Sequence, residues 1–257
     1  VQAANIKDGE PILEIGAGLG VLTEALIKKG AKVWALEIDS GFYRILREKF
    51  GDSDQVVLIH GDALKYDFRS LANEIGKLRV IANLPYRISS RLIFLFYENR
   101  DIFSSLYILL QKEVAERLTA EPGSNEYGIL TVLLGVSAQV DILFQIPPKA
   151  FYPTPEVFSA LTRIRFPEVS PITVLESSFL IRLVKLSFSG RRKTLKNALK
   201  NASAIGLSPE TIPIAAEIAG IDLNRRGETL SPAEFARFAD SMVNLQRLQQ
   251  NSMENGI

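Results

Sequence analysis

Short runs of apolar residues alternate with longer amphipathic stretches through the first two thirds of the 257-residue chain. The apolar runs have the length of buried strands, and helical patterns separate the first five of them. This alternation predicts βαβ units on a largely parallel sheet, with the last two strands pairing as an antiparallel edge. The expected strands are Pro11–Ile15, Lys32–Ile38, Val56–His60, Arg79–Asn83, Ser105–Gln111, Val140–Ile146 and Leu161–Phe166, and the early helices include Leu19–Lys29, Ser40–Phe50 and Ser89–Tyr97.

The pattern changes at Pro167, beyond which only helical periodicity is found. Ser208-Pro209 and Ser231-Pro232-Ala233-Glu234 predict helix starts, because each places a capping serine before a proline at the first helical position. We therefore expect a Rossmann-like α/β catalytic domain over residues 1–167 and a small all-α domain over residues 168–257.

Composition narrows the chemistry, because the chain has no cysteine and a single histidine, His60. Disulfides, thiolate metal sites, iron–sulfur clusters and methylation through a cysteine adduct are excluded. No metal is expected, and His60 ends an apolar run, so we interpret it as a structural residue. No apolar run is long enough to span a bilayer, so no membrane contact is expected. The absence of disulfides fits a cytoplasmic protein. The chain begins with Val1 in what reads as a helix end, and a preceding N-terminal piece is expected.

The net charge is only +1, but the basic residues are distributed unevenly. No Asp or Glu occurs from Ser177 to Pro209, a segment that carries seven Lys and Arg residues. Such a local field suits a polyanion such as RNA, and a solvated helix face is the alternative. The residues expected to contact RNA are Arg191, Arg192, Lys193 and Lys196.

A glycine-rich loop follows the first expected strand, in Glu14-Ile15-Gly16-Ala17-Gly18-Leu19-Gly20. Nicotinamide-binding folds use a similar loop, but they require G-x-G-x-x-G to bring a helix N-terminus to a pyrophosphate. Here the third glycine comes one residue early. An acid two residues before the first glycine suits S-adenosylmethionine, which has no phosphate and carries a positive sulfonium and ammonium.

Two further acids follow the next two expected strands. Glu37 ends the second, where a carboxylate can accept both ribose hydroxyls, and Asp62 follows the third, placed to bind an adenine amino group. Each acid alone is more often a turn or surface residue. Three acids at the carboxyl ends of successive parallel strands favour a shared ligand site.

Asn83-Leu84-Pro85-Tyr86 follows the fourth expected strand. An exocyclic amine has a lone pair delocalised into its ring, and two acceptors for its N–H groups would favour the pyramidal geometry needed for attack. The Asn83 side-chain oxygen and the Leu84 carbonyl can serve, while Tyr86 and Phe151 can stack on a flipped-out base. The alternatives are a capped turn for the tetrapeptide and simple loop packing for Phe151.

Together these motifs resemble the ribosomal RNA adenine N6-dimethyltransferases, and most closely their bacterial small-subunit branch, whose loss confers kasugamycin resistance. The resemblance runs from about Pro11 to Phe238. It rests on the glycine loop with Leu22-Thr23, Gly61-Asp62-Ala63, Asn83–Tyr86 with Ile88-Ser89-Ser90, Gln111–Ala115, Phe151-…-Pro153-…-Pro155-…-Val157-…-Ser159-Ala160, Arg191–Leu195 and Arg226–Leu230.

The resemblance implies dimethylation of two adjacent adenosines near the 3′ end of 16S rRNA, on a pre-30S particle, by a monomer. It implies S-adenosyl-L-methionine as cofactor and S-adenosyl-L-homocysteine as product. The target adenine would be held by Asn83, Leu84, Tyr86 and Phe151. The expected cofactor contacts are Glu14, Gly16, Gly18, Glu37, Ile38, Asp62, Ala63 and Asn83.

Two departures from the family pattern are visible. Ala17 replaces the usual proline of the glycine loop, and the family's N-terminal motif with glutamine and phenylalanine is absent. Two other functions stay open: the same chemistry on large-subunit RNA, and a ribosome-assembly or transcription factor that uses the fold for binding.

Overall fold

The computed structural model describes residues 1–152, 154–190, 192–206 and 208–254. The chain forms two compact units. The first comprises Val1–Glu116 and Gln139–Glu168, and the second comprises Arg117–Ala138 and Val169–Ile257. The first unit ends at Glu168, next to the expected boundary at residue 167, whereas the segment Arg117–Ala138 belongs to the second unit.

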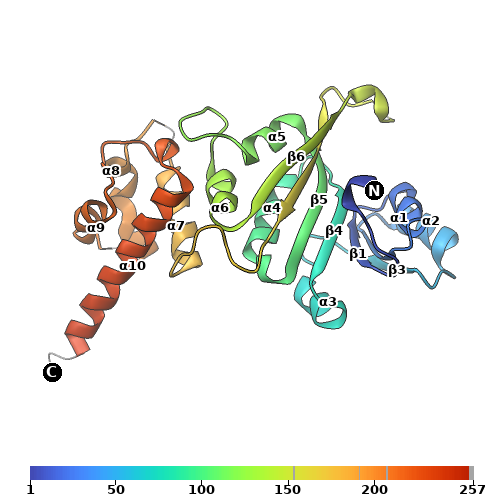
Figure 1. Cartoon of the computed structure of the whole chain (residues 1–257), viewed down its shortest axis with the longest axis horizontal. Coiled ribbons are helices and arrows are strands. Elements are labelled where there is room, and N and C mark those ends of the chain that lie inside the picture. Colours follow the sequence, from blue (N-terminus) through green and yellow to red (C-terminus); the bar gives the residue numbers. More distant parts are fainter. Residues whose placement is uncertain (153, 191, 207, 255–257) are drawn as a thin grey trace. The chain divides into compact units, whose positions relative to one another are not determined.

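The first unit is built on a seven-stranded sheet in the order β3-β2-β1-β4-β5-β7-β6 (Figure 1). Strands β1 to β5 pair in parallel, and β7 pairs antiparallel with both β5 and β6, as the sequence predicts for the edge. The strands are β1 (Pro11–Ile15), β2 (Lys32–Glu37), β3 (Val56–His60), β4 (Leu78–Asn83), β5 (Phe103–Gln111), β6 (Gln139–Ile146) and β7 (Ser159–Arg165).

Helices connect the parallel strands, as right-handed βαβ crossovers require. They are α1 (Val21–Ile27), α2 (Ser40–Phe50), α3 (Phe68–Ile75) and α4 (Ser89–Glu98). Helix α5 (Lys112–Leu118) follows β5, and short 3₁₀ turns are η1 (Gln2–Ala4), η2 (Arg100–Ile102) and η3 (Pro148–Ala150). The expected helix Ser40–Phe50 is matched at both ends, and Asp39 caps it by accepting from the backbone N–H groups of Gly41 and Phe42.

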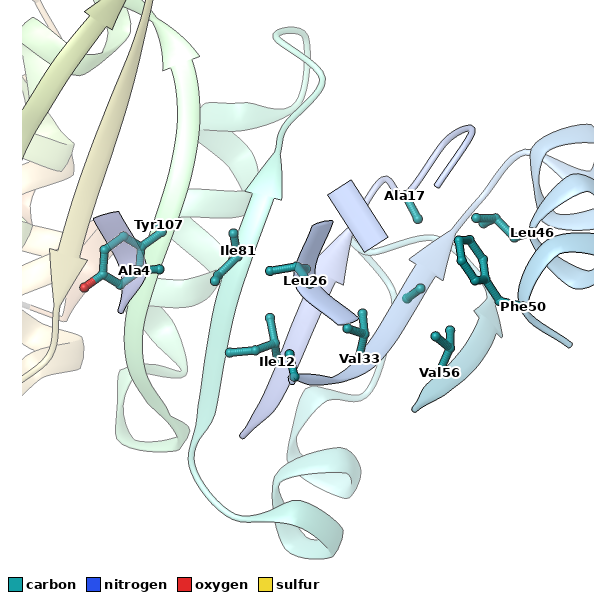
Figure 2. Packing of buried hydrophobic residues seen from close by; sticks show 12 residues of the cluster. Ala4, Ile12, Ala17, Leu26, Val33, Leu46, Phe50, Val56, Ile81 and Tyr107 are labelled. Carbon is teal, nitrogen blue, oxygen red and sulfur yellow. The ribbon is translucent and has the colours of Figure 1, made fainter. Parts of the chain in front are cut away.

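Buried apolar side chains fix the glycine loop against the sheet. A cluster that includes Ile12, Leu26, Val33, Leu46 and Phe50 joins the strands to α1 and α2 (Figure 2). Gly20, just before α1, has φ 77°, and a Cβ there would lie 2.5 Å from Cε2 of Phe50. Only glycine fits this position, so the loop shape is set by packing as well as by backbone conformation.

The second unit is helical. Its elements are α6 (Ile129–Ser137), α7 (Ser177–Ser187), α8 (Leu195–Ala198), η4 (Leu199–Ile205), α9 (Thr211–Ala219), η5 (Gly227–Thr229) and α10 (Pro232–Glu254). Phe235, Phe238 and Met242 of α10 are fully buried, as their common face predicts. The capping box before α10 is confirmed, since Glu234 N–H donates to the Ser231 hydroxyl and Ser231 N–H donates to the Glu234 carboxylate.

The predicted helix start at Ser208-Pro209 is wrong. Helix α9 begins at Thr211, with Glu210 at its N-cap and no side-chain cap. Ser208 accepts the Thr211 N–H and hydroxyl through its backbone carbonyl, so its hydroxyl does not cap the helix. None of the helices in the described residues is both long and apolar enough to cross a membrane.

Candidate active site

The glycine loop turns directly from β1 into α1 at the carboxyl end of the sheet. Gly16, Gly18 and Gly20 all have positive φ, the conformation in which glycine avoids a steric cost. A Cβ on Gly16 would lie 3.8 Å from both the Asn83 carbonyl oxygen and Cδ of Pro85. The loop after β1 therefore runs beside the loop after β4, and two predicted groups of site residues meet there.

Glu37, the last residue of β2, holds the glycine loop in place. One carboxylate oxygen accepts the Gly18 N–H at 2.8 Å, and the other accepts the Asp39 N–H at 2.8 Å. The side chain is almost entirely buried. Each oxygen keeps a second lone pair, so the group can accept further hydrogen bonds from a ligand while it fixes the loop.

Glu14 lies in β1 and is completely buried. One of its oxygens accepts the Thr23 hydroxyl at 2.6 Å, and the other, Oε1, has no hydrogen-bond partner. Burial raises the pKa of the Glu14 carboxyl to about 7, an effect that the Thr23 hydrogen bonds oppose and the nearby Glu37 carboxylate reinforces. Glu14 and Thr23 thus form a buried pair with one unsatisfied acceptor.

Asp62 follows β3, which pairs with β2 so that His60 lies opposite Glu37. One Asp62 oxygen accepts the Leu64 N–H at 2.9 Å, which folds the turn. Of the neighbouring candidates, Ala63 is buried and Ile38 is 62% exposed. Glu14, Glu37 and Asp62 accordingly stand at or near the carboxyl ends of three adjacent strands, as predicted.

His60 takes no part in this acidic group. Its ring stacks on Tyr43 with centroids 4.8 Å apart, and Nε2 lies 3.2 Å from the Ile38 carbonyl oxygen. It is an exposed residue at the end of β3, consistent with the structural interpretation.

A cavity of about 270 Å³ lies next to the glycine loop, where β4 ends. All four residues expected to hold the target base line it, together with three residues of the same two loops. The lining residues are Asn83, Leu84, Pro85, Tyr86, Phe151, Tyr152 and Pro155. Sequence reasoning gave Tyr152 and Pro155 no role of their own, although both belong to the proline-stiffened segment that follows η3.

The loop after β4 is fixed at several points. Leu84 is buried, and the Ser89 hydroxyl donates to the Tyr86 carbonyl at 3.0 Å. The Tyr86 hydroxyl lies 2.7 Å from the Ser159 hydroxyl, across to the first residue of β7. Asn83, by contrast, is exposed at the end of its strand. The cavity therefore combines the solvent-exposed Asn83 with a loop that hydrogen bonds of Tyr86 hold in place.

The residues of the glycine loop and the neighbouring strand ends fit a small cationic nucleoside cofactor. Glycines with positive φ give the backbone close access, and the buried Glu14 oxygen without a partner is an acceptor with unused capacity in β1, just before the loop. Within the described residues no group of three or more His, Asp or Glu side chains is placed to hold a metal ion, and the chain has no cysteine.

The predicted RNA contacts lie in the second unit. Arg192, Lys193 and Lys196 are exposed, and Arg191 lies outside the described residues. The two motifs of this unit are adjacent, because Thr194 forms a β-bridge with Arg226 and Leu195 N–H donates to the Arg225 carbonyl. Arg182, in the same acid-free segment, lies 3.7 Å from Glu176, which stands just before that segment.

Comparison with known proteins decides the family. Residues 1–242 match the family model described as ribosomal RNA adenine dimethylase. The chain belongs to this family. Two relatives named ribosomal RNA small subunit methyltransferase A are similar to most of it. The protein from Desulfitobacterium hafniense is 43% identical over 95% of this chain and 86% of its own length, and the one from Geobacter metallireducens is 44% identical over 94% and 90%.

Solved structures agree with the family assignment. A dimethyladenosine transferase from Plasmodium falciparum has a TM-score of 0.74 and 25% identity, covering 96% of this chain and 93% of its own. The 23S rRNA methyltransferase ErmE, 21% identical with 94% of each chain covered, has a TM-score of 0.65 and shows the shared fold. The expected Rossmann-like methyltransferase fold, the enzyme class and the family resemblance are thereby confirmed.

Proposed function

We propose that this chain transfers methyl groups from S-adenosyl-L-methionine to N6 of two adjacent adenosines in the 3′-terminal hairpin of 16S rRNA. The observation that carries the proposal is the cavity at the end of β4, whose lining includes Asn83, Leu84, Tyr86 and Phe151. Family membership and the names of the relatives support the RNA substrate and its subunit.

Asn83 and Leu84 would prepare the nucleophile. The Asn83 side-chain oxygen and the Leu84 backbone carbonyl would each accept one N–H of the adenine amine, which favours a pyramidal nitrogen whose lone pair is localised instead of delocalised into the ring. The amine attacks as the neutral species, so no general base is needed, and the proton leaves after transfer. Placing both acceptors at a strand end gives them little freedom, which is how positioning lowers a barrier.

The aromatic residues would hold the base. A base inside a helix cannot reach the cavity, so the target is flipped out and its rings are retained by stacking. Tyr86 and Phe151 lie on separate loops that line the same cavity, and they can cover the two faces of one adenine.

The cofactor would lie along the glycine loop. When bound, it supplies an electrophilic methyl group on a positive sulfur. Gly16 and Gly18 let the backbone approach it, Glu37 accepts from its ribose, and Asp62 with Ala63 and Ile38 borders its adenine. Glu14, buried at the end of β1 just before the loop, would offer its unpartnered carboxyl oxygen, and Asn83 stands where the cofactor and target sites meet. S-adenosyl-L-homocysteine would be the product.

The partner would be the small ribosomal particle before its maturation, met by a cytoplasmic monomer. Arg192, Lys193 and Lys196 are exposed in the second unit and would contact phosphates, which fix position without reading sequence. Arg191 is expected to join them from its place in the sequence.

Mass spectrometry of 16S rRNA tests the proposal. Small-subunit particles lacking the modification are incubated with the protein and isotope-labelled S-adenosyl-L-methionine, and the RNA is digested. We expect labelled N6,N6-dimethyladenosine at two neighbouring positions near the 3′ end. Label in large-subunit RNA only, or no transfer by a folded protein, would contradict it.

A further inference from the structure

The hydroxyl groups of Tyr86 and Ser159 form a contact that the methyl-transfer mechanism does not explain. They lie 2.7 Å apart, so one donates to the other. Ser159 is completely buried, whereas Tyr86 is half-buried and lines the cavity. The contact spans 73 positions of the sequence and joins the loop after β4 to the start of β7.

Ser159 provides a firm anchor, because the sheet holds its backbone from both sides. It pairs with Gln111 of β5 and with Ile146 of β6. Just before it, the Phe158 carbonyl accepts the Lys112 N–H at 2.8 Å. A hydroxyl at this position has little freedom to move with respect to the strand ends.

The tyrosine is held at its other end as well. The Ser89 hydroxyl donates to the Tyr86 carbonyl, and Ile88 N–H donates to the Pro85 carbonyl, which closes the turn. A Tyr ring has two rotatable torsions, and a bond at the hydroxyl restrains both when the backbone is fixed. The ring plane of Tyr86 is thus set before any base enters.

The position of Ser159 in the chain adds a second consequence. The segment with Phe151, Tyr152 and Pro155, which forms the other wall of the cavity, runs directly into β7 and therefore into Ser159. The start of β7 thus ties down the ring of one wall and directly follows the segment that carries the other wall.

We infer that Ser159 is a positioning residue that sets the Tyr86 ring for stacking on the target adenine, so that the base slot is formed before substrate binding. This inference rests on the proposed function of the cavity. Ser159 does not touch the base. It acts through the tyrosine hydroxyl. Phenylalanine would offer the same stacking surface as tyrosine, but it could not form the hydrogen bond that orients the ring.

Single-turnover methylation of unmodified small-subunit particles tests the inference with Ser159→Ala, Tyr86→Phe, Tyr86→Ala and the double variants. Losing one hydrogen bond should slow transfer by about two- to tenfold. Ser159→Ala and Tyr86→Phe should be slowed equally, and combining them should add nothing further, since both remove the same bond. Particle affinity should stay at the wild-type value, because the particle is held mainly by other surfaces.

The decisive comparison is Ser159→Ala in the Tyr86→Ala background. We expect no additional slowing there, because the ring that Ser159 positions is gone. An equal slowing in both backgrounds, or wild-type transfer by Ser159→Ala, would overturn the inference. Ser137→Ala is the matched control: its buried hydroxyl donates to the Leu133 carbonyl in α6, so it reports the generic cost of losing a buried serine hydroxyl. Absence of transfer by the wild-type protein would instead refute the proposed function itself.

Discussion

Glu14 is a carboxyl group enclosed by the protein on all sides, with one oxygen bonded to Thr23 and the other without a partner. Its burial costs the ionised form its hydration, which raises its pKa to about 7 in the folded protein. In the unfolded chain the same group has its ordinary pKa of 4.5. The protein therefore binds a proton more tightly here when folded.

This difference between the folded and unfolded pKa of Glu14 predicts that the free energy of unfolding depends on pH. With a folded pKa above the unfolded one, the contribution of Glu14 is largest below pH 4.5 and decreases as the pH rises to about 7. The loss amounts to about 3 kcal/mol, the free energy that corresponds to this pKa difference.

The glutamine variant Glu14→Gln removes the titration and keeps an oxygen that can accept from Thr23. We expect unfolding measured by urea titration between pH 4 and 8 to show the variant gaining stability relative to wild type as pH rises. Thr23→Val, which removes the donor and keeps the acid, should retain the slope. Parallel profiles for wild type and Glu14→Gln would show that the carboxyl is not buried as described.

Single residues differ in how far the sequence alone predicts their roles. Gly16, Glu37, Asp62 and Asn83 could be placed from strand ends alone, because parallel strands bring their carboxyl ends to one edge. The second role of Glu37, accepting the Gly18 N–H, could not, since it depends on the positive φ of the loop. Thr23 and Ser159 carried no visible signal beyond being polar residues inside quoted motifs, and only three-dimensional proximity gives them partners.

Among the elements, apolar runs located every strand to within two residues. In β1, β2 and β4 most residues are buried, which leaves a nearly continuous apolar signal in the sequence. The starts of helices were harder to predict, because a serine side chain can cap a helix or leave the cap unused. Ser231 and Glu234 form the expected reciprocal cap, while the same dipeptide at Ser208-Pro209 forms a turn two residues ahead of α9. Serine before proline permits a cap without enforcing it.

These two serines give a matched test of the capping box. Ser231→Ala removes an acceptor for the Glu234 N–H and should destabilise the protein by about 1 kcal/mol. Ser208→Ala leaves the backbone carbonyl that Thr211 uses, and its stability should stay within about 0.5 kcal/mol of wild type. Thermal unfolding of the two variants checks this, and equal losses would contradict the assignment of the cap to Ser231 alone.

For the molecule as a whole, a net charge of +1 conceals an uneven distribution of charge between two compact units. The acids predicted to hold the cofactor all lie in the first unit, and the acid-free basic segment lies in the second. Periodicity placed the boundary near residue 167, but the inclusion of Arg117–Ala138 in the helical unit was not predictable. Its helix α6 packs against α7 and α10, and such long-range partners are invisible in a local pattern.

The basic segment makes a prediction about salt. Replacing Arg192, Lys193 and Lys196 with glutamine should weaken binding to small-subunit particles and flatten the slope of log K against log salt by roughly 2–3 units. Neutralising Lys29, Lys65 and Lys77, three exposed lysines of the first unit, changes the net charge equally and is the control. Filter binding across a salt series measures both, and equal slopes for the basic-segment variant and wild type would place the RNA elsewhere.

The central claim is that the cavity at the end of β4 is where adenine N6 accepts the methyl group. Single-turnover transfer to unmodified small-subunit particles, with mono- and dimethyladenosine separated by mass spectrometry, tests it through Asn83→Ala. Unmethylated adenine offers two N–H groups to two acceptors, so losing the Asn83 oxygen should slow the first transfer by about 10²-fold or more. Folding and particle affinity should be retained, and Asn73→Ala, which alters an exposed asparagine of α3, should transfer normally. Dimethyladenosine formed by Asn83→Ala at the wild-type rate would contradict the account.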